Sequence, residues 1–274
     1  MSEKKQSIFR DIIENRALIG NLARNDFKQK FAGSVFGIVW AFVQPMVTVL
    51  VYWFVFEKAL NQGTAATKAG INVPYVLWLL SGLVPWFFFS EVLSAGTNTF
   101  VEYNYLVKKV VFKIDTLPLV KVISSSFVHI FFVGFTLVLY SCYHFYPNLY
   151  TIQVVYYSLA MMILCLGIIY ATSALTVFFR DLNQLVTIVL GVLMWMTPIM
   201  WNLDGMVLPK WIEIILKLNP MYYIVAGYRD ALIYQRWFWE RPGITLYFWV
   251  FTGCMLWFGV SIFKKLQNHF ADVL

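Results

Sequence analysis

The chain has no Asp, Glu, Lys or Arg between Lys121 and Arg180. An uncharged, apolar segment of this length is too long for the core of one soluble domain. It has room for two helices of about 20 residues, each crossing a hydrocarbon layer of roughly 30 Å. Over all 274 residues, 60% are hydrophobic and only 13% are charged, far from the average of globular proteins. The missing charge predicts an integral membrane protein.

The chain also lacks the short motifs of common enzymes. It has no Gly-Lys dipeptide, which excludes a phosphate-binding P-loop. It has no HExxH, no GxSxG and no Cys/His cluster with zinc spacing. The three cysteines, Cys142, Cys165 and Cys254, lie in apolar runs and predict buried, reduced thiols. We therefore predict no catalytic residue, no metal site and no cofactor bound by this chain.

Ionisable groups inside the apolar runs are few. His129 lies in the middle of one run, where a lone histidine is more often a hydrogen-bonding group between helices than a catalyst. Glu91 is the only acid expected inside a span. It either has a functional role or, being close to the boundary, snorkels to the surface or pairs with a neighbouring arginine. Because ion-coupled carriers usually need acids or histidines near the midplane, uphill transport by this chain would need energy from another subunit.

Length and charge divide the chain into six predicted spans. They cover residues 35–56, 74–93, 122–143, 152–178, 185–201 and 244–263. Residues 1–34 are expected to form a cytoplasmic, amphipathic interface segment, and residues 35–274 a single transmembrane domain. A turn is expected at Tyr146-Pro147-Asn148-Leu149. The predicted fold class is an all-α, six-span membrane protein.

The distribution of basic residues predicts the orientation. Fourteen of the 21 Lys and Arg residues lie before the first span, between the second and third, or after the fourth and sixth. By the positive-inside rule, both termini are then cytoplasmic. The basic excess faces the cytoplasm, where anionic lipid headgroups, rather than nucleic acid, are the expected partner.

Residues 207–234 do not fit another full crossing. They contain two short apolar pieces, Val207–Leu218 and Met221–Tyr234, separated by Asn219-Pro220. Pieces of this length are typical of re-entrant or interfacial helices. We predict a re-entrant pair between spans five and six at the outer mouth of a passage. The alternative is a peripheral extracellular hairpin.

Two further segments are expected to lie along the membrane surface. The stretch Ile8–Leu22 has an apolar stripe at helical spacing and is predicted to be an interfacial helix, for anchoring or for docking a partner. The stretch Asn98–Thr116 mixes apolar and basic residues and ends before Leu117-Pro118. Its apolar side would pack on the spans, which leaves the charged side free for another protein.

Six sequence motifs occur in a recognisable order. They are RNDFKQKF at 24–31 with GSVFGIVWAFVQP at 33–45, GLVPWFFFS at 82–90, LVKKV at 106–110 with LPL at 117–119, FFRDL at 178–182, TPIMW at 197–201 and NPM at 219–221. In this order the chain resembles, over nearly its whole length, type-2 ABC-transporter permeases that export cell-surface polysaccharides. It departs from them at Phe112-Lys113-Ile114-Asp115, where relatives often have Pro-Arg, and this puts the fine contact with the ATPase in doubt.

The resemblance implies an export channel made of two copies of this chain in the cytoplasmic membrane of a bacterium. Two cytoplasmic P-loop subunits would bind ATP and Mg²⁺, and their closure would rock the spans. The cargo would be a polyprenyl-diphosphate-linked polysaccharide, such as an O-antigen, capsule or teichoic acid precursor. Predicted contacts with the ATPase are Glu102, Lys108, Lys109 and Asp115. The alternative role of these charges is ordinary membrane-surface charge.

Three further groups of residues are candidates for the transport path. The substrate entrance would contain Arg180, Asp181, Arg24 and Lys28, since arginine binds phosphate through two parallel hydrogen bonds; a structural ion pair is the alternative. Aromatic faces suit sliding sugar rings, although aromatics in spans mostly pack or lie at headgroup level. The candidate channel aromatics are Trp40, Phe42, Trp53, Trp86, Phe87, Phe88 and Trp195. The candidate external gate is Asn219, Pro220, Met221 and Tyr222.

Three other functions compete with this interpretation. A type-2 permease for another lipid or a drug shares the six-span plan. A membrane-embedded transferase acting on lipid-linked sugars would need a cluster of carboxylates or histidines at one face, and the sequence offers only scattered ones. A passive channel would need a polar stripe, which is absent from the spans.

Overall fold

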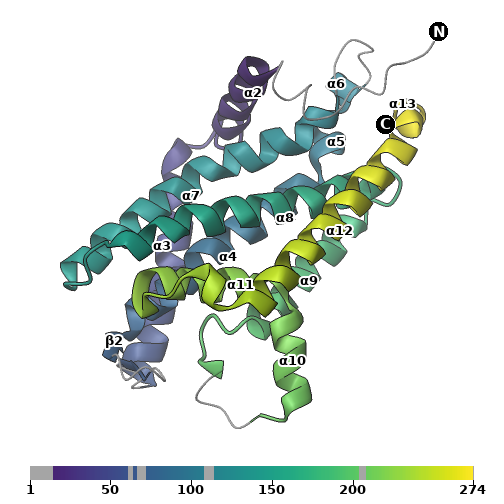
Figure 1. Cartoon of the computed structure of the whole chain (residues 1–274). Coiled ribbons are helices and arrows are strands. Elements are labelled where there is room, and N and C mark those ends of the chain that lie inside the picture. The colour runs from purple at the N-terminus through teal and green to yellow at the C-terminus, as the bar shows by residue number, and fades with distance from the viewer. Residues whose placement is uncertain (1–14, 61–63, 67–71, 108–113, 204–207, 274) are drawn as a thin grey trace.

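The computed structural model describes residues 15–60, 64–66, 72–107, 114–203 and 208–273, and these are mostly helical (Figure 1). The elements are α2 (Arg16–Gln29), η1 (Gly37–Val39), α3 (Trp40–Trp53), η2 (Phe54–Ala59), β1 (Thr64–Ala66), β2 (Asn72–Pro74), α4 (Tyr75–Thr97), α5 (Thr99–Glu102), α6 (Asn104–Val107), η3 (Ile114–Thr116), α7 (Leu117–Cys142), η4 (Leu149–Ile152), α8 (Gln153–Thr176), α9 (Leu182–Met196), α10 (Lys210–Leu218), α11 (Pro220–Arg229), η6 (Asp230–Tyr234), η7 (Phe238–Glu240), α12 (Pro242–Leu266), η8 (Gln267–His269) and α13 (Phe270–Val273).

Among the described residues, five helical segments are long and apolar enough to cross a membrane. They are Gly37–Ala59, Tyr75–Thr97, Ile114–Cys142, Leu149–Thr176 and Pro242–His269. Each overlaps one predicted span. The third begins eight residues earlier than predicted, because the helix starts around Leu117-Pro118, where proline fits the first turn. The described residues agree with the predicted all-α fold class, and β1 and β2 add only a short antiparallel pair between α3 and α4.

The predicted fifth span, 185–201, corresponds to the 15-residue helix α9. A helix of that length rises about 22 Å, which is less than a hydrocarbon layer of roughly 30 Å. After Met196 the chain continues without regular helix, and residues 197–200 are nevertheless buried. The crossing by this segment therefore stays a prediction.

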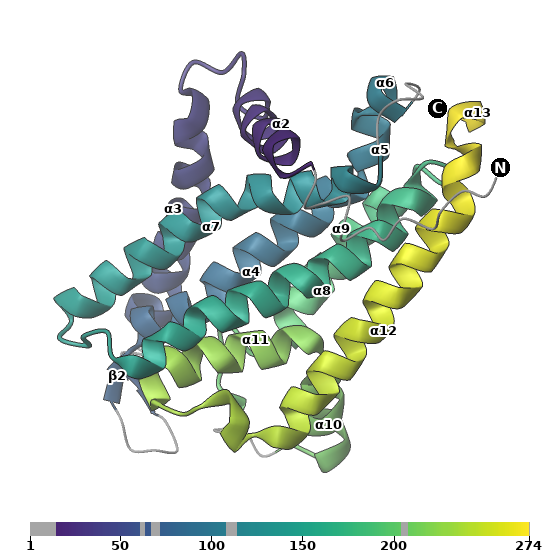
Figure 2. The ribbon, with the colours of Figure 1, turned by 45° about the horizontal axis from the view of Figure 1, so that its top comes forward.

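Helix α4 forms the centre of the bundle. It packs against α7, α8, α9 and α11 (Figure 2), and 78% of its most apolar 18-residue window is buried, against 11% for the Gly37–Ala59 segment. A helix that is apolar all round is expected to be enclosed by others. The α8–α12 pair adds a second extensive helix contact.

The bundle has two distinct ends. Helices α2, α5, α6 and α13 lie at one end, which we call the terminal end, and the β1–β2 hairpin and α10 lie at the other, the far end (Figure 1). The connection between α7 and η4 confirms the predicted turn at 146–149 except for Leu149, which begins η4. There, the Asn148 side chain accepts a hydrogen bond from the Tyr150 amide at 3.0 Å, as expected for a residue that starts a helix.

The surface helices carry large apolar side chains on their outer faces. The exposed residues on α3, α9 and α12 include Val47, Leu50, Val51, Leu185, Ile188, Val192, Trp195, Val250, Trp257 and Phe258. Such faces are expected where lipid, or another membrane protein, replaces water. Of the cysteines, Cys165 is buried and unpaired, but Cys142 and Cys254 are exposed. The prediction of three buried thiols was therefore wrong for two of them.

The predicted N-terminal helix is described only in part. Residues 8–14 lie outside the described residues. Helix α2 begins at Arg16 and continues to Gln29, seven residues beyond the predicted end at Leu22. Its buried residues Ile19, Ala23 and Asp26 face α7. The extension follows from this contact, because burial against a neighbouring helix stabilises turns that the surface pattern alone does not mark.

Candidate functional site

A network of ionised groups joins α2 to the rest of the terminal end. The Asp26 carboxylate accepts hydrogen bonds from the Tyr103 hydroxyl at 2.5 Å and from the Lys121 ammonium at 2.7 Å. Lys121 also donates to Glu102 at 2.6 Å. The side chains of Asp26 and Lys121 are only 10% and 8% exposed. The network therefore fixes α2 to both α7 and the α5–α6 segment.

The charges in this network stabilise one another. Burial alone would raise the pKa of Asp26, but the Lys121 ammonium and the hydrogen bonds from Lys121 and Tyr103 hold the pKa of that carboxyl below its usual value. Burial and the neighbouring Asp26 carboxylate raise the pKa of Tyr103 well above its ordinary value. At neutral pH, Asp26 is therefore an anion, and Tyr103 is a neutral hydrogen-bond donor.

Glu91 has a partner at the same end. Lys30, which follows α2, forms an ion pair with Glu91, and the Ser125 hydroxyl lies 3.4 Å from the same carboxylate. The pairing interpretation of Glu91 is confirmed, although the partner is a lysine rather than an arginine. Between the Glu91 and Asp26 groups lies a pocket of about 280 Å³, lined in part by Lys30, Glu102 and Lys121.

The predicted ATPase contacts occupy this terminal end as far as the structure describes them. Glu102 ends α5, and its side chain is 48% exposed although it bonds Lys121. Asp115 lies in η3, where its carbonyl oxygen accepts a hydrogen bond from the Tyr170 hydroxyl at 2.6 Å. Lys108 and Lys109 lie outside the described residues. Contact with an ATPase stays a prediction.

The predicted entrance residues are all exposed but are not gathered into one pocket. Arg24 and Lys28 lie on the outer face of α2, away from its contact with α7. Arg180 and Asp181 lie in the turn between α8 and α9. The two polar pockets described in this section are not lined by any of the four. Their role at an entrance stays a prediction.

The predicted channel aromatics divide into two groups. Trp86 and Phe88 are buried in the core of the chain, where Phe88 packs against His129. Trp40 and Trp195 are exposed, while Phe42, Trp53 and Phe87 are partly buried. Trp53 lines an apolar groove of about 390 Å³ between α3, α4 and α7. The exposed aromatic side chains lie on the outer surface of the chain, whereas the buried ones pack between its helices.

A polar cluster lies inside the bundle. His129 of α7 is buried, with Nε2 at 3.1 Å from both the Ser158 hydroxyl of α8 and the Tyr228 hydroxyl of α11. The two hydroxyls lie 2.6 Å apart. The predicted role of His129 as a hydrogen-bonding group between helices is confirmed. Tyr228 and Ser158 were missed, because nothing in the local pattern distinguishes them from other span residues.

A buried arginine supports the chain where α9 ends. Arg229 of α11 donates to the carbonyl oxygens of Pro198 at 2.7 Å and Ile199 at 2.8 Å. Its guanidinium carbon lies 3.5 Å from the ring centroid of Trp78, in a cation–π contact. Irregular backbone away from water requires such partners for its carbonyl groups. Arg229 therefore allows the segment after α9 to be buried without being helical.

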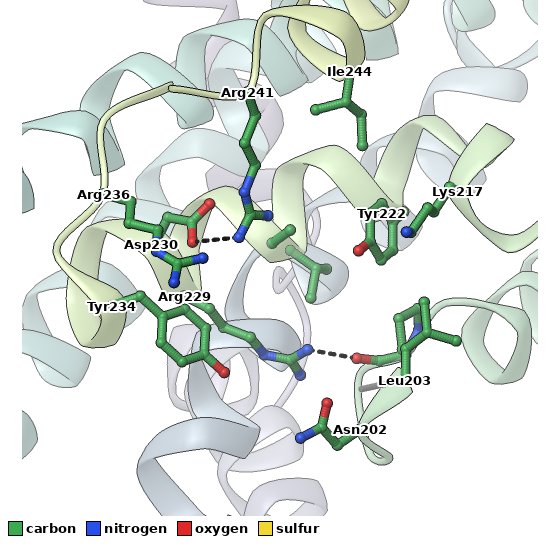
Figure 3. Close-up of a pocket in the computed structure, with 13 residues that line it drawn as sticks. Asn202, Leu203, Lys217, Tyr222, Arg229, Asp230, Tyr234, Arg236, Arg241 and Ile244 are labelled. Carbon is green, nitrogen blue, oxygen red and sulfur yellow. Dashed lines mark hydrogen bonds and ion pairs between the residues drawn. The ribbon is translucent and has the colours of Figure 1, made fainter. Parts of the chain in front are cut away.

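A polar pocket of about 450 Å³ opens beside Arg229, towards the far end (Figure 3). Its walls come from α10, α11, η6, the loop after α9 and the start of α12. It is lined by four cationic side chains, those of Lys217, Arg229, Arg236 and Arg241, and by one acidic residue, Asp230. We call it the far-end pocket.

Asp230 is paired within the far-end pocket. Its carboxylate accepts a hydrogen bond from Arg241 at 3.1 Å. Burial raises the pKa of Asp230 to about 6, although Arg241 and Arg236 act in the opposite direction. One carboxylate facing four cationic side chains neutralises only part of the positive charge of the pocket.

The predicted gate residues begin α11. The Asn219 side chain accepts a hydrogen bond from the Met221 amide at 3.0 Å and donates to the Thr197 hydroxyl at 2.7 Å. This joins the start of α11 to the end of α9. Tyr222 lines the far-end pocket. The pocket residues that were not among the predicted site residues include Arg229, Asp230 and Arg241. The signal that marks the first two is a pair of charges inside an otherwise apolar piece.

Comparison with known proteins agrees with this architecture. The ABC-2 type transporter family matches residues 17–233. The chain is 26% identical to an O-antigen export system permease protein, RfbA, of Klebsiella pneumoniae, with 92% of this chain and 93% of the relative covered. It is 25% identical to the protein of the same name from Myxococcus xanthus, with 97% and 98% covered. With its apolar helices, the chain is a multi-pass membrane permease that belongs to the ABC-2 type transporter family.

Proposed function

We propose that this chain is the channel-forming permease of an ATP-driven exporter that moves polyprenyl-diphosphate-linked polysaccharide across the cytoplasmic membrane of a bacterium. The observation that carries the proposal is similarity over more than nine tenths of the chain to two permeases named for O-antigen export. The match runs through the segments of both ends of the bundle rather than one apolar helix, so it reflects more than shared hydrophobicity.

The proposed topology has six crossings and cytoplasmic termini, with α10 and α11 as a re-entrant pair. The positive-inside rule supports this orientation, because fourteen of the 21 Lys and Arg residues lie before the first predicted span, between the second and third, or after the fourth and sixth. The burial of α11 against α4 and α8 supports the re-entrant interpretation. A peripheral hairpin would leave α11 exposed. Helix α10, in contrast, is mostly exposed.

The proposed assembly contains two copies of this chain and two P-loop subunits, which bind ATP and Mg²⁺. The terminal end is the docking surface, with α2, Glu102, Asp115 and the 108–109 lysines as contacts. The buried Asp26–Lys121 ion pair would allow this surface to transmit movements of the ATPase to the spans. Because the ion pair joins α2 directly to α7, a displacement of α2 would also displace α7.

The proposed path begins at the terminal end with Arg24, Lys28, Arg180 and Asp181 and ends at the Asn219–Tyr222 gate. The exposed aromatics Trp40 and Trp195 are the best placed of the candidate channel residues, since only surface side chains of one copy reach a passage shared by two. Aromatic faces offer sugar rings apolar contact without a fixed hydrogen-bond register.

The experiment that tests the proposal is co-purification of the tagged chain from its native membranes in mild detergent. We expect a P-loop subunit in equal amount, a particle mass equal to two of each chain, and ATPase activity. Deletion of the gene should leave lipid-linked polysaccharide inside the cell. If the chain purifies alone, the exporter proposal fails. If an ATPase accompanies it but surface polysaccharide is unchanged, the chain is a type-2 permease for another lipid or a drug.

A further inference from the structure

The far-end pocket has more positive charge than its carboxylates neutralise. Of its cations, Lys217 forms an ion pair with Glu213, and Arg241 forms one with Asp230. In the described part of the chain, the other two, Arg229 and Arg236, have no carboxylate within ion-pair distance. Glu240, the next acid along the chain, already accepts a hydrogen bond from the Trp237 amide at 2.9 Å. The pocket therefore has a net positive charge.

Arg236 is held in place by its backbone while its side chain stays available. Its amide donates to the Asp230 carbonyl oxygen at 3.1 Å, and its own carbonyl accepts from the Gln153 side chain at 2.8 Å. The residue is exposed, and its guanidinium lies 5.9 Å from the ring of Tyr234. Because the backbone is already fixed, binding of a ligand costs only the entropy of ordering the Arg236 side chain.

We propose that the far-end pocket binds an oxyanion of the phosphate-ester or diphosphate class. The hydrogen-bond donors to the anion would be Arg236, Lys217 and Arg241. The buried guanidinium of Arg229 adds a fixed positive charge to the wall of the pocket. Arginine forks match phosphate oxygens with two parallel hydrogen bonds, and lysine adds a point charge. The volume of about 450 Å³ falls within the range of small-ligand clefts, roughly 300–1,000 Å³.

Only the identity of the molecule that carries the anion rests on the proposed function. If the chain exports polyprenyl-diphosphate-linked cargo, the pocket receives the diphosphate on the far side of the membrane, after passage. Oxyanion binding itself follows from the charges of the pocket and holds for any phosphate-bearing lipid or free anion. Binding of the anion is measured without the ATPase, so its failure and the failure of the export proposal are separate results.

The test uses the full-length chain in detergent at low salt, with the melting temperature followed by tryptophan fluorescence. The probes are inorganic pyrophosphate and farnesyl diphosphate, with sodium chloride at equal ionic strength as the screening control. Ligand that binds only the folded state raises the melting temperature, and the rise grows with the logarithm of the ligand concentration divided by Kd. We expect both probes to stabilise the wild-type chain.

The variants are Arg236→Gln and Lys217→Gln, with Lys210→Gln as the matched control. Lys210 is exposed on the same helix as Lys217 but does not line the pocket. Loss of one charge-assisted contact should raise the pyrophosphate concentration needed for half the effect by about tenfold. The control should behave as the wild type. Within the part of the chain that the structure describes, the Arg236 guanidinium makes no hydrogen bond to another residue, so its variant should fold. Lys217→Gln provides a second, independent measurement.

Each outcome decides the proposal. Weaker binding in both pocket variants, but not in the control, supports it. Stronger binding of farnesyl diphosphate than of pyrophosphate assigns the site to a lipid-carried headgroup, and equal binding assigns it to the anion alone. No stabilisation of the wild type by either probe, or equal stabilisation of wild type and both pocket variants, overturns it.

Discussion

At the scale of single residues, buried charges determine which segments of this chain are held together. The Asp26–Lys121 contact joins residues 95 positions apart, and it is shielded from water on both sides. Arg229 has a different role, because its partners are backbone carbonyls rather than a carboxylate. The Asp26–Lys121 ion pair attaches α2 to the bundle. Arg229 instead supplies hydrogen bonds to carbonyl groups that no helix satisfies.

Replacement of Asp26 by asparagine should release α2 from α7. The variant removes the negative charge opposite Lys121 and weakens two short hydrogen bonds, at a cost of about 2 kcal/mol. Hydrogen exchange of the α2 amides should become faster, whereas Lys28→Gln on the exposed face of the same helix should leave it unchanged. Equal exchange in the two variants would show that apolar contacts alone hold α2.

The pH dependence of this attachment follows from the lowered pKa of Asp26. A carboxyl whose folded-state pKa is depressed stabilises the fold at pH values above its unfolded pKa, and the stabilisation is lost as the pH falls through the folded value. The unfolded value is close to 3.8. Protection of α2 amides in the wild type should therefore be constant from pH 5 to 8 and should decrease only below about pH 4.

At the scale of elements, glycines let α8 and α12 approach closely. A Cβ atom added at Gly167 would lie 2.8 Å from the backbone nitrogen of Leu256, and one at Gly259 would collide with the Gly167 carbonyl oxygen. Small residues at helix contacts are common in membranes, where close packing replaces the hydrophobic effect as the source of attraction. The α8–α12 contact therefore depends on two positions without side chains.

Gly167→Ala should destabilise the chain, because the neighbouring atoms belong to backbone and α12 must move as a whole. We expect a loss of about 1–3 kcal/mol, seen as a lower melting temperature in detergent. Gly253→Ala is the matched control, since a Cβ atom at Gly253 of α12 meets nothing within 4 Å. An equal effect of the two substitutions would mean that helix propensity, rather than contact, determines the result.

At the scale of the whole molecule, the bundle separates a basic terminal end from a far end that carries the hairpin, α10 and the far-end pocket (Figure 2). Helix α4 lies at the centre of the bundle, whereas α3 and α9 expose apolar faces. One copy thus has a complete core but leaves wide apolar surfaces for lipid or for a second copy.

The proposed topology predicts opposite accessibility for two exposed positions. In a chain with its three cysteines replaced, Tyr146→Cys should react with a membrane-impermeant maleimide on intact cells. Asn268→Cys should react only after permeabilisation. Three crossings, by α8, α9 and α12, separate the two positions. Labelling of both from the same side would show that the short helix α9, with the segment after it, does not cross.

Features that depend on neighbouring residues in the chain were predictable from the sequence, whereas features that depend on contacts between distant residues were not. Uncharged runs such as 122–179 located the spans, because a bilayer requires about 20 consecutive apolar residues whatever the neighbours are. The turn near Asn148 and the break at Asn219-Pro220 were also predictable, since turn signals lie in consecutive residues. The early start of α7 and the extension of α2 were not predicted, because the buried position of Lys121 depends on Asp26.

The sequence by itself thus determined that the chain lies in a membrane, where its long helices run and, from the order of short motifs, which family it resembles. Only the tertiary structure decided that Glu91 pairs with Lys30, that Arg229 binds the carbonyls after α9, and that four cations from separate segments surround one pocket. The physical reason is that hydrocarbon thickness acts on consecutive residues, whereas charge pairing and carbonyl satisfaction act between residues that only packing brings together.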